Sequence, residues 1–248
     1  MFGTKNKEIN EKKTFAREKT VILPSSFPDE PKEVTIRRPK NKDYDIILDE
    51  KYRKKGENFD RFLSANTGLP LEQIQNMFMG DRFFLMVEIR KMKNPVYETP
   101  VFNKRTGENE TVEIDLNDLR LQKANPELLK KDGKDLVFEC FLPYQNVKVI
   151  GKLLKGPDEK KLEKIQKKNS NKLWSNQMML RVKEIEGRSH KNIHFFEDLD
   201  SEDTEIFNQK YEKADIGYDT RCKGVGEDGH EFEYDLPLDQ AFFLGKAG

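Results

Sequence analysis

A short segment that occurs twice, once near the middle of the chain and once near its end, constrains the fold more than any other feature. The first copy opens with Tyr97-Glu98-Thr99 and closes with a strand that ends at Asp115-Leu116. The second copy opens with Tyr218-Asp219-Thr220 and closes in the same way at Asp235-Leu236. Each copy has glycine in a polar turn, which is typical of a β-hairpin. The repeat predicts a duplicated architecture, and chance similarity of two polar turns is the alternative.

The residues before the first hairpin predict short strands followed by helices. Alternating and β-branched residues favour strands at 34–37 and 45–48. Helical spacing predicts three helices, which run through Phe59–Leu63, from Pro70 to Phe78 and through Phe84–Met92. Gly80-Asp81 is interpreted as a stop followed by the N-cap of the third helix. The apolar face of that helix is wide, which indicates a central position.

The residues before the second hairpin predict the same order of elements. Strands are expected at 136–141 and 147–150, and helices are expected to begin at Gly156, near Trp174 and near Ser201. The sequence therefore predicts an α+β fold of two related halves, each with short strands, helices and a β-hairpin.

The predicted domain boundaries follow from this duplication. The N-terminal half with the first hairpin is placed at 21–130, and the C-terminal half with the second hairpin is placed at 131–248. Residues 1–20 are expected to form a flexible charged tail, because they carry too few apolar side chains to offset the entropy of ordering.

Composition narrows the class of protein. Charged residues make up 36% of the chain and apolar residues 35%, so the core is thin and part of the apolar surface is expected to form an interface with a partner. Lys+Arg and Asp+Glu both number 45, and this balance argues against a general nucleic-acid binder. The two cysteines favour a reducing cytosol, and no apolar run reaches the roughly 20 residues of a membrane span, so a soluble protein is expected.

Residues that could carry chemistry are sparse. His190 and His194 have the spacing of a metal pair on a helix, but residues 191–193 look more like a loop that enters a strand. The glycines at 224 and 226 are interpreted as a tight turn rather than a phosphate loop. Cys222 and His230 could be the remnant of a zinc ribbon, but two further ligands are missing. We therefore expect no catalytic residue, no cofactor, no metal and no small-molecule substrate.

Several segments together resemble the baseplate hub and hub-assembly proteins of T-even-type contractile-tailed bacteriophages. The residues that carry the resemblance are Gly80–Leu85 with Ile89-Arg90, the hairpin Tyr97–Leu116, the helix start Gly156-Pro157-Asp158-Glu159 and the closing stretch Gly229–Leu238. Many members of that family look like degenerate zinc ribbons with Cys-x-x-Cys pairs at the two hairpins, and this chain lacks the pairs. The resemblance implies a non-enzymatic protein that binds other tail and baseplate proteins. It also implies a location in the host cytoplasm during assembly, and in the tail baseplate if the protein stays in the virion.

Apolar residues at both ends of the predicted fold are the candidate partner-binding residues. Phe27 lies in a proline-punctuated apolar stretch, which is expected to pin the chain to a surface. Phe242, Phe243 and Leu244 form a C-terminal apolar run, which either packs on its own domain or docks into a neighbouring subunit. The alternative function is a nucleic-acid-associated adaptor that uses the basic runs 51–55 and 160–168, although such runs are usually solvated helix faces.

Overall fold

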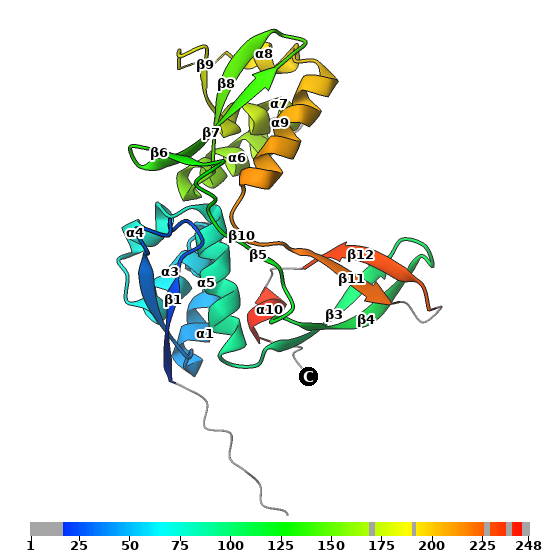
Figure 1. The fold of residues 1–248 in the computed structure, drawn as a ribbon. Helices are drawn as coiled ribbons and strands as arrows, with labels where there is room; N and C mark the ends of the chain where they lie inside the picture. The colour runs from blue at the N-terminus through cyan, green and yellow to red at the C-terminus, as the bar shows by residue number, and fades with distance from the viewer. Residues whose placement is uncertain (1–16, 169–171, 190–191, 226–228, 237–239, 245–248) are drawn as a thin grey trace, which may run out of the picture.

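The computed structural model describes residues 17–168, 172–189, 192–225, 229–236 and 240–244. Helices and small antiparallel sheets form two lobes and a projecting arm (Figure 1). The α+β class predicted from the sequence is therefore confirmed. Among the described helices, none combines the length and the apolar character needed to cross a bilayer.

The first lobe is a helical bundle covered on one side by a β-ribbon. The ribbon pairs β1 (Glu18–Ile22) with β2 (Glu33–Arg37), and the helices are α1 (Asn41–Leu48), α2 (Glu50–Lys54), α3 (Asn58–Thr67), α4 (Leu71–Gln75) and α5 (Met79–Lys91). Leu85, Val87 and Ile89 of α5 are all fully buried, so apolar contacts surround this helix. Helix α5 has the central position that its wide apolar face predicts.

Two hairpins form the arm, which projects sideways from the first lobe (Figure 1). One hairpin pairs β3 (Val96–Asn103) with β4 (Glu108–Asp115), and the other pairs β11 (Arg221–Val225) with β12 (Glu231–Asp235). Side chains alternate between buried and exposed along the strands, and the buried sides of both hairpins share one hydrophobic cluster. The hairpins are separate sheets held together by side-chain packing.

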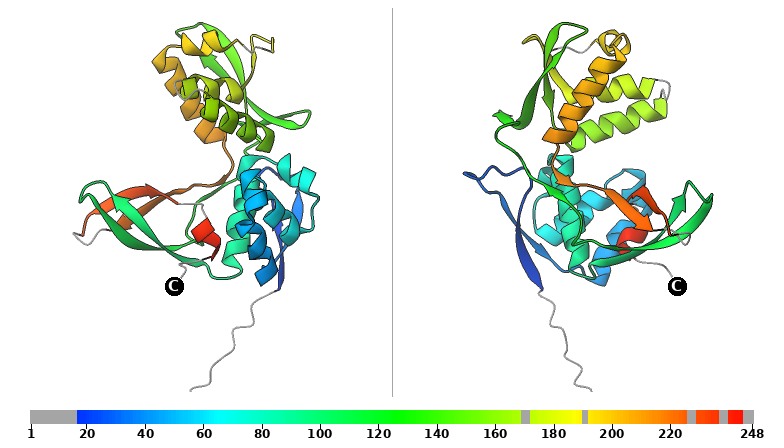
Figure 2. Two further views of the ribbon diagram at one scale, coloured as in Figure 1. Left: turned by 180° about the vertical axis from the view of Figure 1, so that it is seen from behind. Right: turned by 45° about the vertical axis from the view of Figure 1, so that its right-hand side comes forward.

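The second lobe is a four-stranded antiparallel sheet with helices packed on it. Its strands, in sheet order, are β6 (Lys130–Asp132), β7 (Asp135–Leu142), β8 (Val147–Lys152) and β9 (Val182–Ile185). Its helices are α6 (Gly156–Lys168), α7 (Leu173–Arg181), α8 (Ile193–Glu197) and α9 (Ser201–Ala214). The ring centroids of Phe138 on β7 and Phe207 on α9 lie 5.5 Å apart, which joins helix to sheet. Figure 2 shows this lobe from two further sides.

The chain crosses between the lobes twice, and the two crossings pair with each other. Strand β5 (Leu121–Gln122) leads out and β10 (Gly217–Tyr218) leads back, in antiparallel register. The second hairpin and α10 (Gln240–Leu244) consequently pack with the first lobe, although the second lobe precedes them in the sequence. The C-terminal half expected at 131–248 is thus shared between both lobes.

Two local predictions are wrong for identifiable reasons. Residues 45–48 lie in helix α1, where Asp43 and Ile47 are buried four positions apart, so a short β-branched run was misread as a strand. Gly80-Asp81 lies in the first turn of α5, which already begins at Met79. The stop at Gly68 is confirmed, because this residue caps α3 in the left-handed region at a φ of 71°.

Candidate functional site

The C-terminal aromatic pair is part of the core. Phe242 and Phe243 are 0% and 1% exposed, and the ring of Phe243 lies 5.0 Å from that of Phe62. Arg90 Nε donates a 2.7 Å hydrogen bond to the carbonyl of Phe242, and Leu244 is half-buried. Docking into a neighbour requires exposed rings, whereas these rings are buried within the chain, on the first lobe rather than on the C-terminal half expected at 131–248.

Phe27 is buried too, against the second lobe. It lies in the turn between β1 and β2, is 7% exposed, and belongs to the second lobe's hydrophobic cluster. The ammonium of Lys131 stands 5.1 Å from the centre of its ring. The stretch around Phe27 pins the chain to a surface as expected, but that surface belongs to the same molecule.

The candidate metal ligands are not gathered into a site in the part of the chain that the structure describes. No group of three or more His, Cys, Asp or Glu side chains there is placed to hold a metal ion, and the zinc-ribbon detail is not confirmed. Cys140 and Cys222 are buried free thiols, and burial raises the pKa of both. His194 lies in helix α8 and not in the strand expected after residues 191–193, and its Nδ1 lies 3.0 Å from Glu197. His190 lies outside the described residues.

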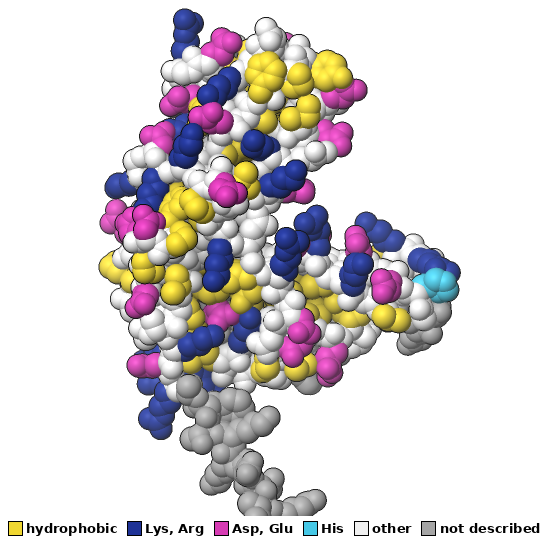
Figure 3. Space-filling view, in the orientation of Figure 1, with side chains coloured by type: hydrophobic (Ala, Val, Ile, Leu, Met, Phe, Trp, Pro, Cys, Tyr) yellow, Lys and Arg dark blue, Asp and Glu magenta, His cyan; other side chains and the backbone are white. Residues whose placement is uncertain are grey.

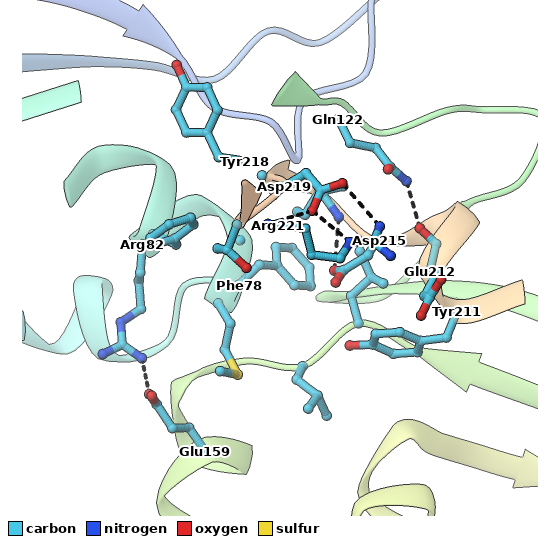
Figure 4. Close-up of a pocket in the computed structure, with 18 of the residues that line it drawn as sticks. Phe78, Arg82, Gln122, Glu159, Tyr211, Glu212, Asp215, Tyr218, Asp219 and Arg221 are labelled. Atoms are coloured by element: carbon cyan, nitrogen blue, oxygen red, sulfur yellow. Dashed lines mark hydrogen bonds and ion pairs between the residues drawn. The ribbon is translucent and has the colours of Figure 1, made fainter. Parts of the chain in front are cut away.

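A cavity of about 560 Å³ lies where the two lobes and the arm meet (Figure 4). Arg82 of α5 lines the cavity. Its Nη1 lies 2.6 Å from Glu159 of α6, and its Nη2 pairs with Asp60 of α3. This guanidinium therefore ties the first lobe to the second. The rest of the wall combines apolar and aromatic side chains, such as Phe83 and Leu153, with the charged residues Arg181, Glu212, Asp215, Asp219 and Arg221.

Close backbone contact fixes the junction beside this cavity. The amide of Met79 donates to the carbonyl of Leu154 at 3.0 Å, and the amide of Gly156 donates to the carbonyl of Met77 at 3.2 Å. A Cβ on Gly80 would lie 2.1 Å from the carbonyl oxygen of Ile216, a distance that no side chain tolerates. The two lobes therefore meet in a close-fitting backbone contact, called the joint below, and the cavity lies beside it.

A buried polar cluster locks the returning strand β10 onto α5. The hydroxyl of Tyr218 donates to Glu88 Oε1 at 2.5 Å, and Lys19 and Lys91 pair with the same carboxylate at 2.6 and 3.0 Å. Burial opposes the charge on Glu88, but these hydrogen bonds outweigh it and hold the pKa of Glu88 below its usual range. The cluster is satisfied within the chain, so its role is structural.

The arm is the feature best placed to contact another protein. Its two hairpins use one face each to pack on one another and leave their outer faces in solvent, and the outer edge of β4 is unpaired among the described strands. Phe102 and Val225, near the free end of the arm, are 55% and 67% exposed. Exposed strand edges are templates for pairing with another chain, and exposed apolar residues favour its capture.

The second lobe also exposes large aromatic side chains. Phe141, Tyr144 and Trp174 are between 55% and 62% exposed, and Figure 3 shows hydrophobic side chains gathered at the end of this lobe. Buried Asp203 accepts hydrogen bonds from the amides of Tyr144 and Gln145 at 3.1 and 2.8 Å, which fixes the turn after β7. The position of Tyr144 is therefore set by this turn.

Sequence reasoning missed these exposed residues because it assigned the aromatics to the core. The alternation of residues along β3 could have identified Phe102 as exposed. Phe102 has the opposite parity to the inward-facing Tyr97 and Thr99, which places it on the outer face of β3. No protein-family model, no curated protein and no solved structure matches the chain.

Proposed function

We propose that this protein is a tail baseplate hub subunit or hub-assembly factor of a contractile-tailed bacteriophage, and that it acts through protein-protein contacts. The observation that carries the proposal is the arm, in which two stacked hairpins offer free strand edges and exposed apolar residues on a braced two-lobe body. Its mechanism is templating: the arm and the second-lobe surface hold partner chains in register. It is an assembly chaperone if it leaves before the particle matures, and a structural subunit if it stays.

The duplicated hairpins support a tandem origin for the two contact elements. Each hairpin is closed by a leucine amide that returns to the residue before the first strand, from Leu116 to Pro95 at 2.9 Å and from Leu236 to Thr220 at 2.8 Å. The tyrosines that open the repeat differ, because Tyr97 lies within its hairpin and Tyr218 lies in β10. We propose that the two related halves correspond most closely at these hairpins.

Affinity purification from infected cells tests this function. Tagged protein should recover tail and baseplate proteins, identified by mass spectrometry, at ratios near stoichiometric. Purified mature virions then separate the two roles, because a chaperone is absent from them and a subunit is present. Recovery of no tail protein by the tagged chain would contradict the proposal.

The alternative, a nucleic-acid-associated adaptor, gains one observation. The two basic runs come near each other at one point, since a Cβ on Gly56, just after α2, would be 3.8 Å from Glu163 Oε2 of α6. The run 160–168 contains Glu163, and Lys54 of the run 51–55 already pairs with Glu50. Filter binding at two salt concentrations tests this alternative, because binding through phosphate contacts weakens steeply as the salt concentration rises.

A further inference from the structure

The backbone of the first hairpin leaves β4 with an open edge. The amide of Leu116 donates to the carbonyl of Pro95, which sets the alternation of inward and outward backbone groups along the pair. By this alternation, Asn109, Thr111 and Glu113 direct their N–H and C=O groups away from β3. All three residues are exposed. The outer edge of β4 can therefore accept a further strand.

The other edge of this hairpin is less suitable. Pro100 occupies an outward position on β3, directly opposite Thr111, and proline has no N–H to offer. Strand β12 of the second hairpin also lies against β3. Of the two edges, only that of β4 has a continuous row of backbone donors and acceptors.

Charge on the outer face of β4 selects the partner. Glu98 and Glu113 are direct cross-strand neighbours, an arrangement that like charges disfavour. No ion pair joins either carboxylate to a base among the residues described for the chain, and Asp115 follows on the same face. On the second hairpin, by contrast, Lys223 lies opposite Glu233 and 3.7 Å from Glu231, so its acids are compensated.

The inner face of β4 is apolar, in contrast to its acidic outer face. Val112 and Ile114 point into the core between the hairpins and border the same edge. A strand added to β4 would place alternate side chains beside these apolar residues and beside the acidic outer face. We propose that β4 binds an extended segment of a partner protein in which lysine or arginine alternates with apolar residues, as an added strand. A second copy of β4 would place its acids beside Glu113 and Asp115, which disfavours it as the occupant.

This proposal rests on the proposed function, because it names the surface and the partner chemistry of the same contact. A capped synthetic peptide, Lys-Val-Lys-Val-Lys-Val, serves as the probe, and Glu-Val-Glu-Val-Glu-Val is its control. Binding is followed by amide hydrogen exchange with NMR detection on the full chain. At a tenfold excess over its Kd, the basic peptide should slow exchange at Asn109, Thr111 and Glu113 about tenfold. The acidic peptide should cause no change.

Variants separate strand addition from charge attraction alone. Thr111→Pro removes one outward N–H that makes no hydrogen bond to β3, so the hairpin keeps its own ladder, and binding should weaken about tenfold. Thr111→Val keeps the N–H and should bind like the natural chain. Glu113→Gln should weaken binding and flatten its salt dependence. If Thr111→Pro fails to fold, unchanged affinity of Glu113→Gln overturns the proposal.

The proposal also fails if Thr111→Pro binds as well as Thr111→Val, if both peptides bind equally, or if protection appears at Glu231 and Glu233 of β12 instead. Because this assay uses a peptide, its outcome is independent of the purification from infected cells. A negative peptide result with tail proteins recovered removes the β4 site alone. A positive peptide result without tail proteins removes the phage function alone.

Discussion

Truncation of Phe243 tests whether the C-terminal helix belongs to the core. The ring is 1% exposed and has three aromatic neighbours, with centroids 5.6 Å from Phe59, 5.0 Å from Phe62 and 5.1 Å from Phe242. Burial of a phenylalanine is worth about 3 to 5 kcal/mol on truncation to alanine, and each favourable ring pair adds about 0.5 to 1.5 kcal/mol beyond area burial. Since the ring pairs are already part of measured truncation costs, we expect Phe243→Ala to lose about 4 to 5 kcal/mol.

Urea unfolding followed by far-UV circular dichroism measures this loss. With a slope of about 2 to 3 kcal/mol per M, the transition of the first lobe should move down by about 2 M. Ala241→Ser is the matched control, because Ala241 is exposed on the same helix and should change stability by no more than about 0.5 kcal/mol. A loss below about 1 kcal/mol for Phe243→Ala would refute the core assignment and return the ring to the list of docking residues.

Three further perturbations test the joint between the lobes and the buried titratable groups. Gly80→Ala should force the lobes apart, because its Cβ would meet the carbonyl oxygen of Ile216 at 2.1 Å. Small-angle X-ray scattering should then show a larger radius of gyration, and an unchanged scattering profile would contradict the close contact of the lobes. Burial raises the pKa of Asp81 from 3.8 to about 6, so the native state holds a proton there that the unfolded state releases. Stability should therefore fall as pH rises from about 4 to about 6, by about 3 kcal/mol relative to Asp81→Asn; parallel pH profiles of the two proteins would refute this. Burial also raises the pKa of the thiols Cys140 and Cys222, so both should react with a disulfide reagent far more slowly at pH 8 in the folded protein than in urea, and equal rates would show that they are accessible.

The sequence predicted local structure correctly where a single glycine or proline sets the start or the end of a helix. Gly68 ends α3 because its left-handed backbone suits glycine, and Gly156-Pro157 begins α6 because proline fits the first turn of a helix. Both hairpins were predicted from their turns and their alternation. The run at 45–48 was wrongly assigned to a strand, because four apolar and β-branched residues are too few to distinguish a helical period from the alternation of a strand.

The arrangement of the lobes was beyond the sequence for a physical reason. The return of the chain depends on the short β5 and β10 pairing and on backbone contacts of Gly80 with Ile216, which leave no hydrophobic period to detect. The candidate site suffered from a similar ambiguity. Phe242 and Phe102 are both aromatic residues near a hairpin, and only packing shows that the first is buried and the second is 55% exposed.

The most direct test of the central claim, that the arm holds partner proteins, is photo-crosslinking in infected cells. A photoreactive phenylalanine replaces Phe102 on the arm in one variant and Leu48 on α1 in another, two apolar positions of similar exposure at 55% and 47%. We predict that position 102 links to a tail or baseplate protein and that position 48 does not. Equal labelling from both positions, or no tail protein captured at position 102, would contradict the account.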